Sequence, residues 1–230
     1  MPITLIMRWK KLNNMTKTIL VINPNSSTSV TEGMAEELKG PCENLNLNIE
    51  FATIAEAPEA IETAEDVEIA HKLAFELVNK SNADAYVIAC FCDPGIVELR
   101  AAGYQNVFGI GESAMHMASN MGANFGIVSI LEASIGRHAE QVERAGLLAK
   151  LAGDRALNLG VLELANIDLA RPRIERVGKT LRDDDGAGAL ILGCAGMGIH
   201  RAWLQDLLRI PIIDPCWAGV AMAAGALGTL

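Results

Sequence analysis

The segment Ala85-Tyr86-Val87-Ile88-Ala89-Cys90 is echoed by Ala189-Leu190-Ile191-Leu192-Gly193-Cys194, whose cysteine lies 104 positions after Cys90. Each segment is an apolar run that ends in a cysteine, and a glycine-containing stretch follows each one. A short apolar run of this kind is typical of a strand buried in a parallel sheet. The echo therefore predicts two equivalent strands in two matched halves of the chain, with one thiol at the end of each strand.

The rest of the chain alternates apolar runs with stretches of helical period. We expect strands at 18–22, 47–54, 86–90, 107–110, 124–129, 157–164, 189–194 and 210–214. Helices are expected between them, at 60–80, 95–102, 132–146 and 174–181, together with helices that end near 38 and 208 and a last helix of small residues. This alternation predicts an α/β fold in which parallel strands are covered by helices on both faces.

Internal duplication is the simplest explanation of this order. Three residues of the first half have counterparts in the second half, in the same order and at nearly the same distance along the chain. The pairs are Ile22 with Val128, Cys90 with Cys194, and Val107 with Pro211. We therefore expect a first lobe at 16–111 and a second lobe at 112–214, with the last helix, 215–230, packed on the first lobe. Residues 1–15 show no matching pattern and are expected to be an extension or a disordered segment.

Composition narrows the class of partner. The 230 residues carry a formal net charge of −9 and show no basic patch, which argues against nucleic acid and anionic membranes as partners. No apolar stretch approaches the roughly 20 residues that a membrane helix needs. An odd number of cysteines, five, argues against a disulfide framework and favours a reducing cytoplasm. We expect a small-molecule substrate as the partner.

The two echoed thiols, Cys90 and Cys194, are the strongest candidates for chemistry. Each stands at a strand end before an expected helix start, where backbone N–H groups and the helix dipole favour a thiolate. Either cysteine alone could equally be a small buried hydrophobic residue. Two of them at equivalent positions favour function, because they can face one pocket from opposite sides. One thiol can then take a proton from a carbon while the other returns one to its opposite face.

The remaining cysteines and the histidines give weaker indications. Cys92 forms a Cys-Phe-Cys triplet with Cys90, but the four histidines (His71, His116, His138 and His200) add no metal-ligand spacing, so no metal site is expected. Cys42 is read as incidental and Cys216 as a packing residue. His200 is expected at the surface or at a helix cap rather than as a catalytic base.

Polar residues follow other strand ends, where ligands bind in open parallel sheets. Asn23-Pro24-Asn25-Ser26-Ser27 can be a ligand-facing turn or only a helix cap. Asp93-Pro94 resembles an N-cap followed by proline at the first helical position, so Asp93 is given a structural role. Gly109-Ile110-Gly111-Glu112 lacks the full glycine pattern and the lysine of a phosphate loop, and nucleotide binding is discounted.

Five motifs together resemble the hydantoin and allantoin racemase branch of the aspartate/glutamate racemase superfamily. They are Val21 to Ser27, Ile88 to Gly95, Gly109 to Glu112, Leu192 to Met197 and Pro211 to Pro215, and the resemblance runs from about Lys17 to the C-terminus. It implies two pseudo-symmetric α/β lobes with the active site in the cleft between them. It also implies that neither a metal nor a pyridoxal cofactor is used.

The resemblance assigns roles to particular residues. Cys90 and Cys194 match the two catalytic cysteines, one a thiolate base and the other a thiol acid, which exchange roles with the hand of the substrate. Backbone amides of Phe91, Cys92, Ala195 and Gly196 are expected to hold the carbonyl oxygens of a planar carbanion. Asn25 and Ser26 are expected to line the same pocket, and Ser129 is placed there as well.

Departures from the family pattern bear on the substrate. Cys92 stands where this branch usually has glycine, and Ser129-Ile130 stands where a threonine-rich turn is common. The chain lacks the Asn-Thr and Thr-His pairs by which amino-acid racemases of the superfamily read a carboxylate and an ammonium group. That absence favours a neutral cyclic ureide over aspartate or glutamate.

Three alternatives remain from the sequence. One is an amino-acid racemase, the second is a decarboxylase or cis-trans isomerase of the same fold, and the third is a small-molecule binding protein without activity. A binding protein would need no thiolate near neutral pH. The alanine- and glycine-rich last helix also leads us to expect a homo-oligomer.

Overall fold

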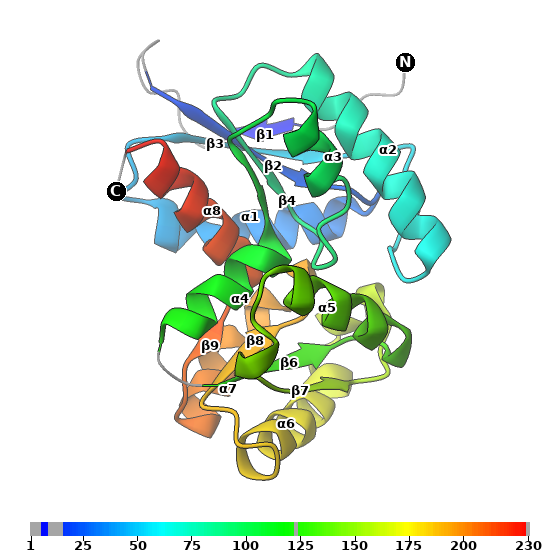
Figure 1. Ribbon diagram of the computed structural model, residues 1–230, viewed down its shortest axis with the longest axis vertical. Helices are drawn as coiled ribbons and strands as arrows, with labels where there is room; N and C mark the ends of the chain where they lie inside the picture. The colour runs from blue at the N-terminus through cyan, green and yellow to red at the C-terminus, as the bar shows by residue number, and fades with distance from the viewer. Residues whose placement is uncertain (1–5, 9–15, 122–123, 229–230) are drawn as a thin grey trace.

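Two sheets organise the molecule, one in each of two lobes stacked along its long axis (Figure 1). The structure, a computed structural model, describes residues 6–8, 16–121 and 124–228. The first sheet has the order β1 (Ile6–Arg8), β3 (Asn48–Thr53), β2 (Thr18–Asn23), β4 (Ala85–Ile88) and β5 (Val107–Gly109), with β1 antiparallel to β3 and the others parallel. The second has the order β7 (Leu151–Ala156), β6 (Phe125–Ser129), β8 (Ala189–Leu192) and β9 (Ile212–Ile213), all parallel.

The two lobes repeat one strand order and one register. If β1 is left out and the four strands of each lobe are numbered in chain order, both sheets have the strand order 2-1-3-4. Ile22 on β2 pairs with Ile88 on β4, and Val128 on β6 pairs with Leu192 on β8. Cys90 and Cys194 each follow two residues after the paired residue of the third strand. The echo in the sequence therefore becomes equivalence in space, as the α/β two-lobe prediction requires.

Helices connect successive strands and cover both faces of each sheet. The α-helices are α1 (Thr28–Cys42), α2 (Ala64–Lys80), α3 (Ile96–Ala101), α4 (Ile110–Asn120), α5 (Glu132–Arg144), α6 (Ile167–Asp183), α7 (Arg201–Leu208) and α8 (Pro215–Ala226). Short 3-10 helices are η1 (Leu148–Lys150), η2 (Val161–Ala165) and η3 (Ala195–His200). Local capping begins several of them: Thr63 and Asp66 form a capping box at α2, and the Asp214 side chain accepts from two N–H groups of α8.

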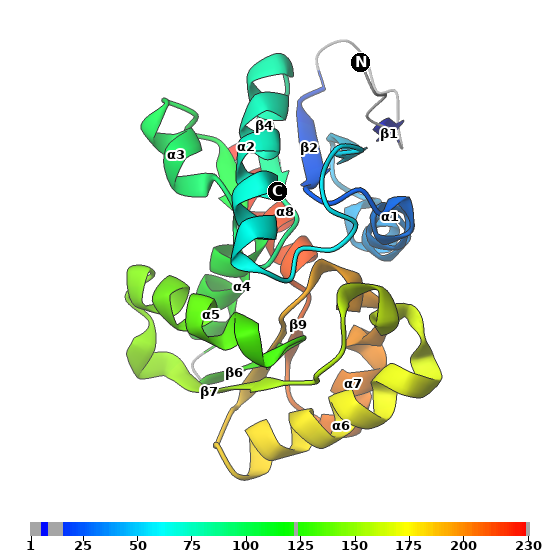
Figure 2. The ribbon, with the colours of Figure 1, turned by 90° about the vertical axis from the view of Figure 1, so that its right-hand side faces the viewer.

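Alternation along the central strands divides each core into two layers. In the first lobe, Ile19 and Val21 pack against α1 and α8, whereas Leu20 and Ile22 pack against α2 and α3. In the second lobe, Val128 packs with α6 and α7. Figure 2 shows α6 and α7 on one side of the second sheet and α5 on the other. Both faces of these strands are buried, so they read as continuous apolar runs.

The last helix returns to the first lobe. Helix α8 packs on β4 and β5 and runs beside α4, which lies where the lobes meet (Figure 1). Its small residues permit this close approach, since a Cβ on Gly219 would come within 2.9 Å of Val87 Cγ1. The alanines and glycines of this helix are thus largely used inside the chain.

Three expectations about the elements were wrong. Residues 157–164 are no strand: Leu157, Leu159, Val161 and Leu164 are buried, but the segment runs as a loop into η2, and the second strand of this lobe is instead β7, just before it. Helix α4 was not foreseen. Ile6–Arg8, expected to lie outside the fold, pair with β3, while 1–5 and 9–15 lie outside the described residues.

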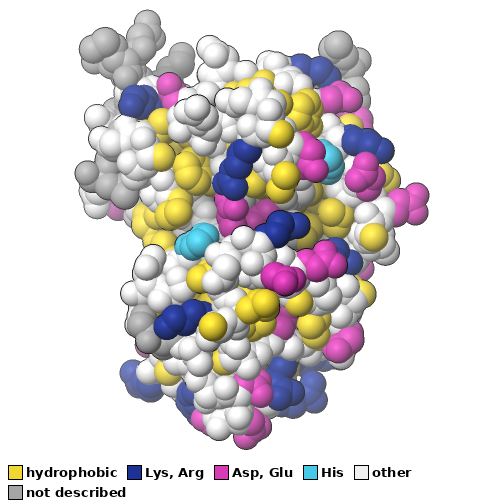
Figure 3. Space-filling view, in the orientation of Figure 1, with side chains coloured by type: hydrophobic (Ala, Val, Ile, Leu, Met, Phe, Trp, Pro, Cys, Tyr) yellow, Lys and Arg dark blue, Asp and Glu magenta, His cyan; other side chains and the backbone are white. Residues whose placement is uncertain are grey.

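The face shown in Figure 3 carries basic and acidic side chains interspersed with apolar ones. Within 6–8, 16–121 and 124–228, no helix is long and apolar enough to cross a membrane.

Candidate active site

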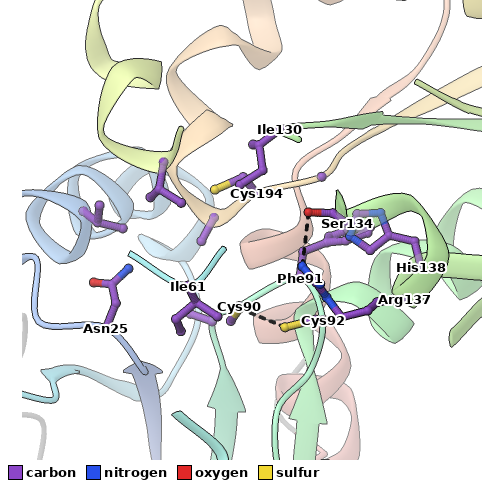
Figure 4. A pocket seen from close by; sticks show the side chains of 15 residues that line it. Asn25, Ile61, Cys90, Phe91, Cys92, Ile130, Ser134, Arg137, His138 and Cys194 are labelled. Carbon is purple, nitrogen blue, oxygen red and sulfur yellow. Dashed lines mark hydrogen bonds between the residues drawn. The ribbon is translucent and has the colours of Figure 1, made fainter. Parts of the chain in front are cut away.

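A cleft between the lobes brings the two echoed cysteines together (Figure 4). About 500 Å³ of space, part of it open to solvent, lies between side chains of both lobes. The first lobe contributes Asn25, Val30, Ile61 and Ala89 to Cys92, and the second contributes Ile130, Ser134, Arg137, His138, Val161 and Gly193 to Ala195. Cys90 is partly exposed there and Cys194 is buried. Strand ends from two lobes therefore meet at one cavity, as the parallel topology predicts.

Most of the residues predicted for the site line this cleft. Asn25, Phe91, Cys92 and Ala195 lie around the two cysteines, whereas Ser26, Ser129 and Gly196 are not among the lining residues. The Ser26 N–H donates to Pro58 O at 3.0 Å, which ties the turn to the loop before α2. Gly196 faces the adjoining groove instead.

The Asn25 turn is rigid because its amides bond within it. Asn23 Nδ2 donates to Asn25 Oδ1 at 2.8 Å, and the Ser27 N–H donates to the same oxygen at 2.9 Å. Ser27 also caps α1 by accepting from the Val30 N–H. The turn is therefore both a helix cap and a wall of the cleft. Figure 4 shows the Asn25 amide nitrogen on the side of the cavity, where it can donate to a ligand.

Ser129 belongs to a buried network behind the cleft wall. Its hydroxyl donates to Asp154 and lies 3.0 Å from His138 Nδ1, which is 2.9 Å from the other Asp154 oxygen. Ser129 is fully buried and is not among the residues that line the cavity. The structure gives no support to the prediction that it binds substrate, because this side chain at the end of β6 is hydrogen-bonded to His138 on α5 and Asp154 on β7. The network instead fixes His138, whose ring forms part of the wall and packs edge-on against Phe91.

Both candidate thiols favour the protonated form in the empty cleft. The hydrogen bond with Cys92 and then desolvation raise the pKa of Cys90 well above its usual range. Desolvation raises the pKa of Cys194 to about 12, with smaller contributions from the charges of Cys90 and Glu62. The expected thiolate-favouring amides are present, since the Cys92 and Gly196 N–H groups act on the two sulfurs and lower both pKa values. Their effect is outweighed, so the prediction of thiols acidified in the resting site was wrong.

Cys92 distinguishes the two thiol loops. Its sulfur lies 3.3 Å from that of Cys90 (Figure 4), while the corresponding residue of the second lobe is Gly196. The thiol does line the cavity, in agreement with the expectation that a side chain at this position would enter it.

Asp93 has a structural role, although not the predicted one. Its carboxylate accepts from the N–H groups of Gly111, at 2.8 Å, and Glu112, at 2.7 Å, and so caps α4 rather than its own helix. Gln141 on α5 donates to it at 2.5 Å and to Phe91 O at 3.0 Å. Asp93 adopts a left-handed backbone with φ of 51° to make these bonds. The loop that carries Cys90 is thereby anchored to both α4 and α5.

The remaining candidates lie outside the cleft. His200 is fully buried rather than at the surface, and its Nε2 donates to Leu164 O at 2.9 Å. It does occupy the N-cap position of α7, the other predicted place, although its side chain makes no cap bond. Cys42 and Cys216 are buried in the first-lobe core. In the part of the chain that the structure describes, no three His, Cys, Asp or Glu side chains gather as a metal site.

Sequence reasoning missed the contribution of α5. Ser134, Arg137 and His138 lie on one face of this helix and reach the cleft, although none of them follows a strand. Their spacing of three and four is the sole local signal that they share a face. Which cavity the face meets depends on how the lobes pack.

Comparisons with known proteins agree with this geometry. The profile of the Asp/Glu/Hydantoin racemase family matches residues 19–223. The hydantoin racemase of Paenarthrobacter aurescens is 36% identical over 217 residues, 91% of this chain and 92% of that protein. Allantoin racemase from Klebsiella pneumoniae superposes with a TM-score of 0.84 at 32% identity over 93% of this chain and 89% of the other. That of Pseudomonas fluorescens gives a TM-score of 0.86 at 25% identity over 92% and 91%. The chain belongs to the Asp/Glu/hydantoin racemase family.

Proposed function

We propose that this chain racemises a cyclic ureide, a 5-substituted hydantoin or allantoin, by a cofactor-independent mechanism with two cysteine bases. Family membership makes it a racemase and therefore an isomerase. The ureide substrate is supported by the names of its relatives, hydantoin racemase and allantoin racemase. One observation carries the mechanism: Cys90 and Cys194 come from equivalent strand ends of opposite lobes and line one cleft.

The chemistry follows from that placement. One cysteine, as a thiolate, removes the proton from the carbon α to the ring carbonyl. The electron pair moves into the carbonyl and forms an enolate, and the second cysteine, as a thiol, protonates the carbon from its other face. The product has the opposite hand, and the two sulfurs have exchanged protonation states. Backbone N–H groups of Phe91 and Ala195, beside the two sulfurs, are the proposed donors to the enolate oxygen.

The resting pKa values shape this proposal. Because both thiols are protonated near neutral pH, the active form carries a thiolate that is scarce in the empty enzyme. Gly196 N–H and Cys92 N–H are already aimed at the sulfurs and stabilise that thiolate when it forms. A substrate that fills the narrow cleft leaves these donors in place while it excludes water.

Hydrogen exchange in heavy water tests the two-base step. Pure enantiomers of a 5-substituted hydantoin and of allantoin are incubated with wild type, Cys90→Ser and Cys194→Ser, and the α-proton is followed by NMR. The wild type should place deuterium at the stereocentre of both hands. Each variant should lose racemisation and exchange one enantiomer, with opposite preferences for the two variants. Equal exchange of both hands by one variant would indicate a single mobile base and contradict the proposal.

The same assay separates the rival functions. Racemisation of aspartate or glutamate without any turnover of ureides would support an amino-acid racemase instead. Tight binding of a ureide without exchange in the wild type would indicate a binding protein.

We also propose a homo-oligomer that works on a small molecule in a reducing cytoplasm. All five cysteines are free, which suits such a compartment. Sedimentation equilibrium tests the oligomeric state, and a monomer at micromolar concentration would contradict that part of the proposal.

A further inference from the structure

The guanidinium of Arg137 lies in the wall of the cleft with unused hydrogen-bonding capacity. Arg137 projects from α5 beside Cys92 (Figure 4). Its Nη2 donates to Glu62 O at 3.0 Å and, more weakly, to Ser134 Oγ at 3.4 Å. Its Nε is buried and finds no hydrogen-bond partner within the described ranges. A cation with an unpaired buried donor is costly, and an acceptor supplied by a ligand would remove that cost.

Carboxylates near Arg137 are occupied elsewhere. The Glu62 carboxylate accepts a hydrogen bond from the Val161 N–H at 2.9 Å. Asp66 is engaged in the cap of α2, where it accepts from the Thr63 N–H at 2.8 Å. Across residues 16–121 and 124–228, no Asp or Glu oxygen forms a salt bridge with Arg137. The charge of Arg137 acts on Asp66, whose pKa it lowers, but no carboxylate hydrogen-bonds to the guanidinium within these ranges, which leaves its Nε without an acceptor.

The rest of the cleft wall limits what that group can be. Ile61, Val30, Ile130 and Val161 give the cleft an apolar part, and Arg137 shares the polar part of the lining with Asn25, Ser134 and His138. The adjoining groove carries Glu36, Glu37 and Glu59, and the chain as a whole has a net charge of −9. These charges oppose the entry of an anion. A neutral acceptor, such as the carbonyl of a carboxamide or ureido group, meets both conditions.

We propose that Arg137 binds the carbonyl oxygen of a polar substituent on the ring carbon that is inverted, and so selects ureides with a carboxamide or ureido arm. The inference rests on the proposed racemase function and names its substrate class. If the two sulfurs face opposite sides of that carbon, its substituent has to extend between them, toward the wall of the cleft. Arg137 stands on that wall next to Cys92. A planar guanidinium holds a carbonyl more firmly than an ammonium group does, because its donors form a fixed fork.

A purely structural role for Arg137 makes a different prediction. The bond from Nη2 to Glu62 O joins α5 of the second lobe to the loop before α2 of the first. If Arg137 served solely as this tie, its loss would loosen the cleft and slow every substrate alike. Selectivity between substrates, rather than activity itself, therefore decides between the two roles.

Two hydantoins of the same shape provide the test. The 5-carbamoylmethyl and 5-isobutyl compounds differ in having an amide where the other has two methyl groups. We compare wild type, Arg137→Met, Arg137→Lys and the control Arg144→Met, an exposed residue on the same helix. Arg137→Met should lower kcat/KM for the carbamoylmethyl compound roughly 10- to 100-fold, chiefly through KM, because a hydrogen bond to a charged group is lost. The isobutyl compound should change by less than about threefold, and Arg137→Lys should fall between.

Other outcomes overturn the inference. Equal losses for the two hydantoins in Arg137→Met would assign Arg137 to the tie between lobes, and no loss for either would remove it from the site. If the wild type racemises neither these two compounds nor allantoin, the proposed function fails, and calorimetric titration with the carbamoylmethyl compound still tests the contact. Weaker binding to Arg137→Met than to wild type and Arg144→Met supports it, whereas equal or undetectable binding in all three proteins overturns it.

Discussion

The loop that carries Cys90 and the loop that carries Cys194 occupy equivalent places in the two lobes but surround their sulfurs differently. In both, the N–H two residues after the cysteine acts on the sulfur. In the first loop a second thiol, Cys92, lies 3.3 Å away, and Asp93 bonds the loop to α4. In the second loop these positions are Gly196 and the buried Met197, and both lie inside η3, which begins directly after Cys194.

The two loops therefore share the backbone that hydrogen-bonds to the sulfur and differ in the side chains around it. A strand end and one N–H are backbone features, which survive replacement of side chains. The neighbours of the sulfur are side chains, and they set the local charge and packing separately in each lobe. We expect two thiols that are alike in role and unequal in environment, and four experiments test this comparison in order of decreasing effect.

Removal of either echoed thiol should have the largest effect. Cys90→Ala and Cys194→Ala should each lower kcat/KM for racemisation by at least ~100-fold, because each removes an acid or base from the transition state. Polarimetry on a pure enantiomer measures this directly. Cys42→Ala alters the first-lobe core and not the cleft, and Cys216→Ala removes a buried thiol that donates to Ala195 O behind the second thiol loop. Neither variant removes a proposed acid or base, so each should keep the activity of the folded enzyme within about threefold.

Cys92→Ala serves as the critical control for the first loop. If it abolished racemisation while Cys90→Ala retained it, the acting thiol would be Cys92, and the equivalence of the two loops would be broken.

Alkaline activation should follow from the raised thiol pKa values. Because burial raises the pKa of Cys194 to about 12 and the pKa of Cys90 is also raised, the thiolate fraction increases throughout the neutral to alkaline range. We expect kcat/KM to rise about tenfold per pH unit between roughly pH 7 and 9. Uncatalysed racemisation also rises with pH, so the Cys90→Ser protein provides the blank. A profile that is flat above pH 7 would show that the thiols ionise much earlier than burial predicts.

The Asp93 anchor should make the first loop sensitive to pH in a way the second is not. Burial raises the pKa of Asp93 to about 8, although three N–H donors partly oppose this. Between about pH 4 and pH 8 the native state then keeps a proton that the unfolded chain has lost, so this group's contribution to stability falls as pH rises. In urea unfolding, the free energy of unfolding of wild type should exceed that of Asp93→Asn at pH 5, and this excess should shrink between pH 5 and pH 8.

Met197→Leu tests the corresponding position of the second loop, where a volume-conserving change at an uncharged site should give a difference independent of pH. A difference between wild type and Asp93→Asn that stays constant from pH 5 to pH 8 would mean that Asp93 is ionised throughout this range and that its hydrogen bonds outweigh burial.

The smallest effect is expected from making the two loops alike. Cys92→Gly should keep racemisation within about threefold, because it removes no proposed acid or base. Since the Cys92 hydrogen bond is the main cause of the raised Cys90 pKa, that pKa should fall. Thiolate absorbance in a Cys194→Ala background follows the change. Gly196→Cys is the reciprocal variant, and a Cβ there meets no atom within 4 Å. An unchanged Cys90 titration in Cys92→Gly would assign its pKa to desolvation alone.

By itself, the sequence determined the features that are local or periodic. Apolar runs specified the buried strands β2, β4, β6 and β8, and the echo placed Cys90 and Cys194 at equivalent ends. These succeed because a strand buried on both faces is apolar at every position, whatever surrounds it. The apolar run 157–164 was wrongly predicted as a strand. Its residues are buried, but an apolar sequence shows only burial and does not show that the segment hydrogen-bonds to a neighbouring strand. The sheet edge is formed by β7, whose residues are half-exposed and mixed in polarity.

Tertiary structure alone decided the surroundings of the thiols. Helix α4 begins at Ile110, and Asp93, 18 residues before Gly111, caps it from a distant loop. Its one local signal is Glu112, whose side chain accepts weakly from the Gly109 N–H. Arg137 and His138 enter the cleft because the second lobe turns α5 toward the first, which no period along the helix encodes. Ser129 hydrogen-bonds with His138 and Asp154 behind the cleft wall, and these partners come from other elements of the lobe. The thiol pKa values depend on how far water is excluded by both lobes together, and desolvation is a property of the assembled cleft rather than of any segment that forms it.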